Sequence, residues 1–232
     1  LTLVAVNTFM RAGNEALWHR AVDEAAACGA DAIIVADLGV LAYAADRHPQ
    51  LRRHLSVQAG AANADHINFL VEAFGIRRVV LPRVLTLAEV ATITRNVACQ
   101  TEVFVYGGLC VMEEGRCSLS SYATGKSPNM HGVCSPASHV RYREDGGEMV
   151  SLLGEFTINR FPASEPAGYP TLCKGRFVTD DTAGYIFEDP VSLDVLGNLD
   201  ALREAGVVAF KIEGRQRGRA YVAKVITEIR RR

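Results

Sequence analysis

Four of the six cysteines lie in one stretch of the chain that is rich in glycine, proline and serine, and their thiols could bind a metal. Cys110, Cys117, Cys134 and Cys173 follow the pattern C-x6-C-x16-C-x38-C. Zinc sites usually contain cysteine pairs spaced C-x2-C to C-x4-C, which this stretch lacks. An iron–sulfur cluster also takes four thiolates and accepts ligands from separate loops, so the wide spacing fits it better. Thiolates are soft ligands for either metal, and residue type alone does not decide between them.

The alternative is that these thiols pack in the protein interior, since free cysteine is among the most buried residue types. The two remaining cysteines fit that interpretation. Cys28 falls on an apolar helical stripe with Leu17, Ala21 and Ala25, and Cys99 lies between a predicted helix and a predicted strand. We therefore predict that Cys28 and Cys99 are structural and that the other four form the metal site.

Length and composition are those of an ordinary globular protein. The 232 residues are 49% hydrophobic and 22% charged, with a formal net charge of -1, which is enough chain for one full core. The near-neutral charge provides no field that would draw the whole protein to nucleic acid or an anionic membrane. No apolar run reaches the ~20 residues of a membrane span, and the first residues lack the charged start of a signal peptide. We expect a cytoplasmic protein with reduced or metal-bound cysteines.

Short apolar runs alternate with helical patterns, which indicates βα units around a parallel sheet. Six such strands begin at Leu1, Asp31, His54, Arg78, Glu102 and Val207. A closed barrel of this class needs eight strands, and the strand-like start of the chain suggests that two units precede it. We therefore predict an α/β fold, a TIM-like (β/α) barrel truncated at its N-terminus, and keep an open doubly wound sheet as the alternative.

A long irregular insertion interrupts this alternation and carries the four cysteines. We predict that residues 1–106 form βα units of the barrel, that residues 107–190 form a cluster-binding insertion, and that residues 191–232 form the closing βα units of the same domain.

Ligands bind at the carboxyl ends of the strands in either fold. The predicted strand ends carry Asn7, Asp37, Gln58, Arg83, Tyr106 and Glu213. Arg83 could hold a carboxylate, and Gln58 could bond a ring substituent or a small acid. Arg215 lies in KIEGRQRGR, between a predicted strand and a predicted helix, which is a suitable place to bind a carboxylate or phosphate. A solvated turn with one or two ion pairs explains this basic cluster equally well. We predict Gln58, Arg83 and Arg215 as substrate-binding residues and identify no catalytic residue.

Several long segments resemble one known family, the collagenase-like peptidase family, and within it members that act in oxygen-independent ubiquinone biosynthesis. The resemblance is carried by VYGGLCVMEEGRCSLSSYATGKSPNMHGVCSPA, GYPTLCKGR and KIEGRQR, and upstream by VNTF, ADAIIVADLGVLAYA, HLSVQA and RVVLPRVL. It covers nearly the whole chain. The resemblance implies a [4Fe-4S] cluster bound by Cys110, Cys117, Cys134 and Cys173.

The same resemblance implies a heterodimer with a related subunit that carries its own cluster. Such a pair is needed to hydroxylate the ubiquinone ring without dioxygen, with prephenate as the hydroxyl donor. Prephenate has two carboxylates, for which Arg83 and Arg215 would be the anchors.

Three alternatives remain open. Related family members hydroxylate RNA bases with the same donor, although the net charge of -1 disfavours nucleic-acid binding. The family name suggests a peptidase, and His131 and His139 lie near Cys134 in the sequence. No sequence motif there indicates a nucleophile or an oxyanion hole, however. The chain could also be a scaffold subunit whose cluster only stabilises the fold.

Overall fold

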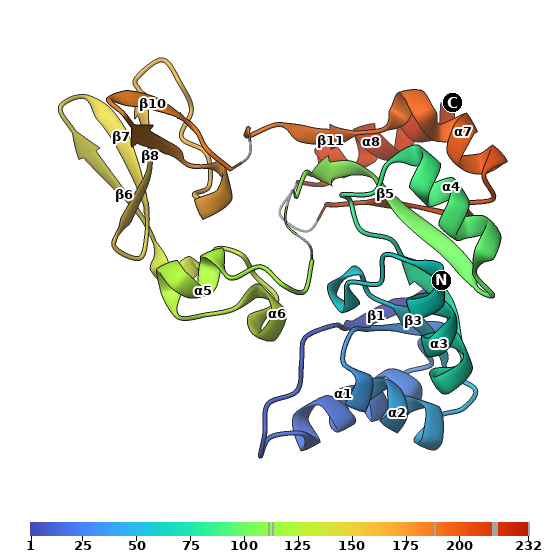
Figure 1. Ribbon diagram of the computed structural model, residues 1–232. Helices are drawn as coiled ribbons and strands as arrows, with labels where there is room; N and C mark the ends of the chain where they lie inside the picture. Colours follow the sequence, from blue (N-terminus) through green and yellow to red (C-terminus); the bar gives the residue numbers. More distant parts are fainter. Residues whose placement is uncertain (111, 113, 188, 215–217, 232) are drawn as a thin grey trace. The chain divides into compact units, whose positions relative to one another are not determined.

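The computed structural model describes residues 1–232 apart from 111, 113, 188, 215–217 and 232. The chain forms two compact units (Figure 1). Unit 1 comprises Leu1–Cys110 and Val191–Arg232, and unit 2 comprises Val111–Pro190. None of the described helices is both long enough and apolar enough to cross a membrane.

Unit 1 is built on a seven-stranded, curled sheet that resembles half of a barrel. Its strands are β1 (Leu3–Val6), β2 (Ala32–Val35), β3 (Arg52–Leu55), β4 (Ile76–Val80), β5 (Gln100–Gly108), β11 (Ser192–Asp194) and β12 (Ala209–Ile212). Strands β1 to β5 pair in chain order and all run parallel, which confirms the βα alternation read from the sequence. β12 pairs parallel with β5, and β11 pairs antiparallel with the end of β5.

The sheet does not close into a barrel within the described residues, because its order runs from β1 to β5 and ends there on β11 and β12. All six predicted strands are present, while the short antiparallel strand β11 is an addition that the sequence did not indicate. Eight strands are needed for closure, so the complete TIM-like barrel stays a prediction.

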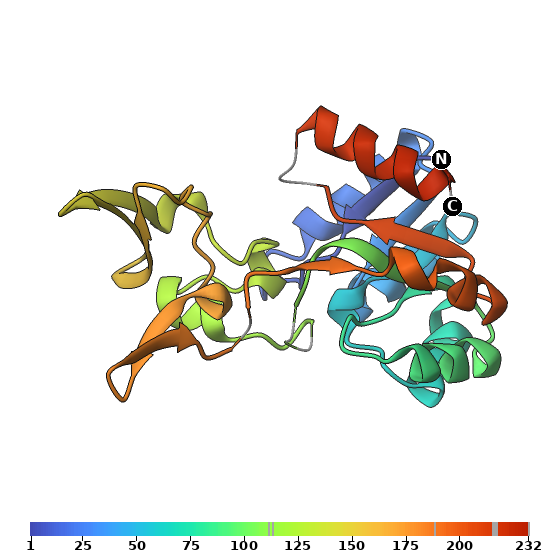
Figure 2. The ribbon, with the colours of Figure 1, turned by 90° about the horizontal axis from the view of Figure 1, so that it is seen from above.

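Helices follow the strands of unit 1 as βα units require. They are α1 (Ala16–Ala27), α2 (Leu38–Arg47), α3 (Ala64–Phe74), α4 (Leu87–Asn96), α7 (Leu199–Glu204) and α8 (Arg219–Arg231), with the short 3-10 turns η1 (Val57–Ala59) and η4 (Leu196–Asn198). Thr86 and Glu89 form the predicted capping box at the start of α4. The two views show α7 beside α4, although more than a hundred residues separate them in the sequence (Figures 1 and 2).

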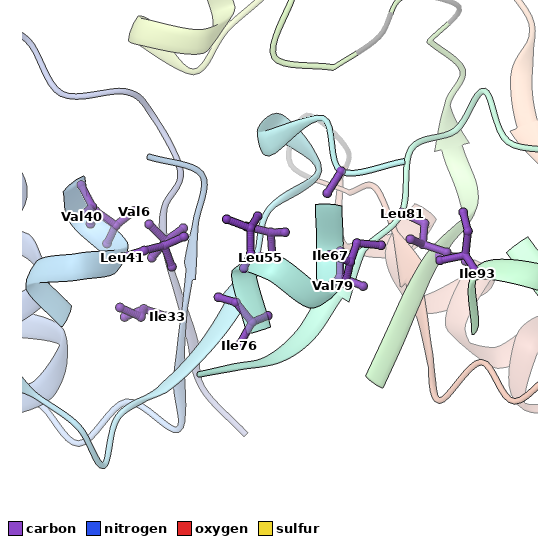
Figure 3. Close-up of a cluster of buried hydrophobic side chains, with 14 of the residues drawn as sticks. Val6, Ile33, Val40, Leu41, Leu55, Ile67, Ile76, Val79, Leu81 and Ile93 are labelled. Carbon is purple, nitrogen blue, oxygen red and sulfur yellow. The ribbon is translucent and has the colours of Figure 1, made fainter. Parts of the chain in front are cut away.

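The hydrophobic core of unit 1 lies between the sheet and its helices (Figure 3). Ile33, Leu55 and Val79 from the strands pack with Leu41 of α2 and Ile67 of α3. Successive strand residues point to opposite faces, and the core therefore takes every second residue. The residues between them lie on the opposite face of the sheet.

Unit 2 holds two small antiparallel sheets and several short helices. The first sheet contains β6 (Val140–Asp145), β7 (Glu148–Leu153) and β8 (Phe156–Pro162), and the second contains β9 (Arg176–Thr179) and β10 (Thr182–Tyr185). The helical segments are α5 (Leu119–Thr124), α6 (Pro128–His131), η2 (Ala137–His139) and η3 (Leu172–Lys174). The region expected to be irregular thus has more strand than its glycine and proline content suggested. Its core cluster is small and is built on Leu153, Ile158 and Leu172.

Candidate functional site

Arg83 lies just after β4, at the carboxyl end of the parallel strands. Its guanidinium carbon lies 3.5 Å from the centroid of the Phe104 ring, which is stacking distance. Its Nη2 donates to Glu213 Oε2 at 2.9 Å. The Arg83 side chain is 9% exposed, whereas that of Glu213 is 48% exposed. A cation is thus fixed on an aromatic face with one partly exposed carboxylate beside it, an arrangement suited to binding a small anion.

Two glycines let Glu213 approach β5 closely. Gly107 has a φ of +135°, and a Cβ placed on it would lie 2.5 Å from the Cβ of Glu213. A Cβ on Gly108 would lie 3.0 Å from Glu213 Oε2. The backbone N–H of Glu213 also donates to the Tyr106 carbonyl oxygen at 2.9 Å. The glycine pair is therefore required for the position of the carboxylate that meets Arg83.

A buried charge network, made of Arg78, Glu102 and Lys211, lies on the same sheet face as Phe104. Glu102 is 5% exposed. It accepts a hydrogen bond from Arg78 Nη1 at 3.3 Å and one from Lys211 Nζ at 2.9 Å. Lys211 Nζ also lies 5.7 Å from the centroid of the Phe104 ring. Two cations around one carboxylate keep this face positively charged beneath Arg83.

Gln58 occupies η1, directly after β3. Its backbone N–H donates to Ser56 Oγ at 3.2 Å, and Asn7 Nδ2 donates to the same oxygen at 3.5 Å. The side-chain oxygen Oε1 of Gln58 is buried and has no hydrogen-bond partner among the described residues. A buried acceptor of this kind is costly unless it meets a donor, so Gln58 is suited to receive a hydroxyl group of a ligand.

The other predicted strand-end residues have different roles. Asp37 caps α2 by accepting from the Val40 N–H at 3.0 Å, and it also accepts from the Met10 N–H at 3.1 Å. The ring of Tyr106 lies 6.2 Å from that of Tyr221. Arg215, which we predicted as the second carboxylate anchor, lies outside the described residues.

Three of the four predicted cluster cysteines belong to segments that meet around α5 in unit 2. Cys117 lies two residues before α5. Ser120 of α5 donates to the backbone carbonyl oxygen of Cys134, and η3, which contains Cys173, lies beside α5. The hydroxyl of Tyr169 donates to the carbonyl oxygen of Ser135 at 3.0 Å and joins the last two segments.

Thiolates are the ligands that an iron–sulfur cluster takes; of the three cysteines in unit 2, Cys117 and Cys173 are half-buried and Cys134 is exposed. Cys110, the fourth predicted ligand, ends the first segment of unit 1. Within the described ranges, no group of three or more Cys, His, Asp or Glu is arranged to hold a metal ion. Binding of an iron–sulfur cluster by the four thiols therefore stays a prediction.

The two remaining cysteines differ from each other. Cys99 packs against the core of unit 1, and burial raises the pKa of its thiol to about 11, so it is protonated and structural as predicted. Cys28 was expected on a buried stripe, but it is exposed at the C-cap of α1, where its thiol faces the Ala25 carbonyl oxygen at 3.3 Å. Leu17 of the same stripe is exposed too, because the helix turns another face, with Trp18 and Val22, to the core.

Two histidines lie near Cys134 in the sequence and bear on the peptidase alternative, because a cysteine peptidase needs a histidine nitrogen held against the attacking thiol. Among their contacts, His131 Nδ1 faces the Ser127 carbonyl oxygen at 3.2 Å, and His139 Nδ1 lies 2.9 Å from Ser138 Oγ.

Phe104, Glu102 and Arg78 were not predicted from the sequence as site residues. A signal was present in the alternation of TEVFVYG, where Val103 and Val105 enter the core and Glu102, Phe104 and Tyr106 point the other way. A charged residue that alternates with valines in a predicted strand marks the face of a sheet that does not enter the core.

The comparisons with known proteins identify relatives along nearly the whole chain. The family described as Peptidase family U32 matches residues 2–231. The chain is 30% identical over 214 residues to tRNA hydroxylation protein P of Escherichia coli strain K12, which covers 84% of this chain and 47% of that protein. It is 29% identical over 229 residues to the 23S rRNA 5-hydroxycytidine C2501 synthase of the same strain, covering 98% of this chain and 30% of that protein.

A third relative carries the name collagenase. This protein of Porphyromonas gingivalis is 27% identical over 233 residues, which covers 96% of the chain and 49% of the relative. The chain thus spans about half the length, or less, of these curated relatives. No solved structure is significantly similar to it.

Proposed function

Because the chain belongs to Peptidase family U32, and relatives in the comparison are named for RNA hydroxylation, we propose that it serves in the hydroxylation of an aromatic ring. The proposed protein is an iron–sulfur subunit similar to UbiU, which pairs with a UbiV-like subunit in oxygen-independent ubiquinone biosynthesis. The proposal rests on the resemblance of the cysteine-bearing segments, which spans both units. We rank a peptidase role lower, because the names of two of the reported relatives refer to RNA hydroxylation.

Arg83 is the observation that carries the proposal at the level of geometry. Its guanidinium is held on Phe104 and donates to the carboxylate of Glu213, and the planar donor fork of an arginine matches the geometry of a carboxylate ligand. Prephenate, the proposed hydroxyl donor, offers a carboxylate for that fork. Gln58 follows β3, the neighbour of β4, and its buried Oε1 would accept a hydrogen bond from a hydroxyl of the donor or of the ring.

The chain's own residues bind and orient in this proposal. Lys211, Arg78 and Glu102 keep the sheet face beneath Arg83 polar and fixed, while Gly107 and Gly108 admit the Glu213 carboxylate. Cys110, Cys117, Cys134 and Cys173 would hold a [4Fe-4S] cluster. A bound cluster of this type supplies one-electron chemistry.

Anaerobic purification of the chain together with a UbiV-like subunit would test this proposal. We expect one [4Fe-4S] cluster per chain by iron and sulfide analysis, and formation of a hydroxylated ubiquinone precursor that depends on prephenate. Arg83→Gln should lower product formation at least tenfold, since it removes a charge-assisted contact worth about 1.5–3 kcal/mol. Arg20→Gln, which changes an exposed arginine of α1, should leave it unchanged. A colourless, iron-free complex that still hydroxylates would contradict the proposal.

Hydroxylation of an RNA base is the second candidate, and the names of the relatives favour it. The formal charge of -1 gives the chain no general attraction to a phosphate backbone. RNA binding that weakens steeply with added salt, together with prephenate-dependent modification of RNA by the purified complex, would favour this candidate over the quinone ring.

A further inference from the structure

An open cavity of about 1030 Å³ lies at the amino ends of β3, β4, β5 and β12 in unit 1. Its wall includes Arg52 at the start of β3, Ile76 at the start of β4 and Val208 just before β12. The candidate site at Arg83 lies at the carboxyl ends of the same strands. The cavity is therefore separate from that site and needs an explanation of its own.

The cavity combines an apolar wall with cationic side chains. The wall is formed by Val71 of α3, Ile76, Val97 and Val208, and the thiol of Cys99 is protonated. Arg77 is an exposed lining residue without an ion-pair partner among the described residues. A ligand that fits both features has an apolar body and a negatively charged group.

His54 supplies the second, independent observation. It lines the cavity, is 4% exposed, and its Nδ1 atom is buried without a hydrogen-bond partner in the described part of the chain. A buried polar atom of this kind is rare in folded proteins and marks a place where a ligand or water completes the bonding. Burial first, and then the charge of Arg78, lower the pKa of His54 to about 4, so the ring is neutral.

The charges around His54 favour an anion. The charges of Arg52, Arg78 and Lys211 lower the pKa of His54, and that of Glu102 raises it; Arg52 Nη2 in addition lies 3.7 Å from Asp31 Oδ1. Arg52 is itself engaged by Asp31, since its Nε donates to the Asp31 backbone oxygen at 2.9 Å. A bound carboxylate would accept a hydrogen bond from the Nδ1–H tautomer of the neutral ring and would be attracted by the surrounding cations.

We propose that this cavity binds a small organic carboxylate with an apolar body, whose charged group faces His54, with Arg77 among the cations that line the cavity. This site would be a second ligand site of the protein, at the amino ends of the strands, and its His54 is acted on by the same Arg78, Glu102 and Lys211 charges that belong to the candidate site.

Histidine-ring NMR of the full chain tests this inference, with benzoate as the probe and inorganic phosphate as the comparison. We expect benzoate at millimolar concentration to shift the His54 resonances and to raise the His54 pKa, because an added negative charge favours the protonated ring. The rings of His19 and His66, which do not line the cavity, are internal controls and should not move.

Two matched variants separate a specific site from general ion binding. Arg77→Gln should weaken the affinity for benzoate about fivefold, as expected for an exposed cation. Arg20→Gln removes an equally exposed arginine far from the lining residues in sequence and should change nothing. The inference is overturned if the His54 resonances do not respond to benzoate, if they respond to phosphate alone, or if the two variants weaken binding equally.

Discussion

The two units of the molecule are stabilised in different ways. Unit 1 packs side chains from its strands and helices into one large core that includes Ile33, Leu55 and Ile67. Unit 2 is built over Val111–Pro190, and its core cluster rests on Leu153, Ile158 and Leu172. Small domains with little core usually need disulfides, metals or partners for stability. Unit 1 is thus organised by burial, whereas unit 2 has a small core that the proposed binding of a cluster by cysteines would reinforce.

Two spectroscopic probes would distinguish the two units. The only tryptophan of the chain, Trp18, is buried in the core of unit 1. Its fluorescence therefore reports the unfolding of unit 1, while near-visible absorption would report a cluster held by Cys110 and the three proposed ligands in unit 2.

The largest expected effect comes from Cys117→Ser. We expect the variant, purified without oxygen, to lose the cluster iron and its absorption, because an iron–sulfur cluster needs its full set of thiolates. Amide exchange should rise across residues 112–187, while the Trp18 unfolding midpoint stays the same. Cys28→Ser, at an exposed thiol, is the control and should keep the iron. Full iron content in the Cys117→Ser variant would remove the proposed difference between the units.

A core substitution should produce the opposite pattern. Leu55 is fully buried in unit 1, and Leu55→Ala should lower the free energy of unfolding by about 2–5 kcal/mol. Denaturant titration followed by Trp18 fluorescence measures this loss, and the iron per folded chain should not change. Leu17→Ala, at an exposed position of α1, should cost much less. Equal losses from the two leucines would contradict the core described for unit 1.

Acid should destabilise unit 1 through His54. Because the pKa of His54 falls from 6.5 to about 4 on folding, the unfolded chain takes up a proton between these values that the folded chain does not. Unit 1 should therefore lose up to about 3 kcal/mol as the pH falls from about 6.5 to about 4. Trp18 melting curves across this range should show a smaller pH dependence for His54→Leu than for the unmodified chain. An unchanged dependence would exclude His54 as its source.

The smallest expected effect concerns a helix cap in unit 1. Thr86→Ala removes the side chain that accepts from the Glu89 N–H at 3.3 Å, and should cost about 1 kcal/mol. Thr92→Ala changes an exposed threonine inside the same helix, where alanine is the better helix former, and should cost nothing. Thermal melts followed by Trp18 fluorescence would compare the two variants. If Thr86→Ala instead lowered the free energy of unfolding by several kcal/mol, the helix cap would contribute as much as a buried core residue, which would contradict the view that burial stabilises unit 1.

Much of unit 1 could be predicted because its signals are local. The alternation of apolar runs with helical patterns indicated the parallel strands, and TLAE indicated the capping box at Thr86. The position of Cys28 was predicted wrongly, because an apolar stripe does not show which way a helix turns when Trp18 and Val22 compete for the core. Strand β11 was missed because three residues at the edge of a sheet have no periodicity of their own.

The sequence by itself determined the residue types of the candidate sites and the βα order of the strands. Both can be read from the spacing of residues along the chain, through the periodicity of apolar residues and the resemblance of motifs. Only the tertiary structure decided that Arg83 stacks on Phe104 and meets Glu213, which lies 130 positions away. It also decided that His54 has a buried nitrogen with no hydrogen-bond partner among the described residues. These features depend on which distant strands become neighbours and on what burial does to a charge, and neither is recorded in local sequence.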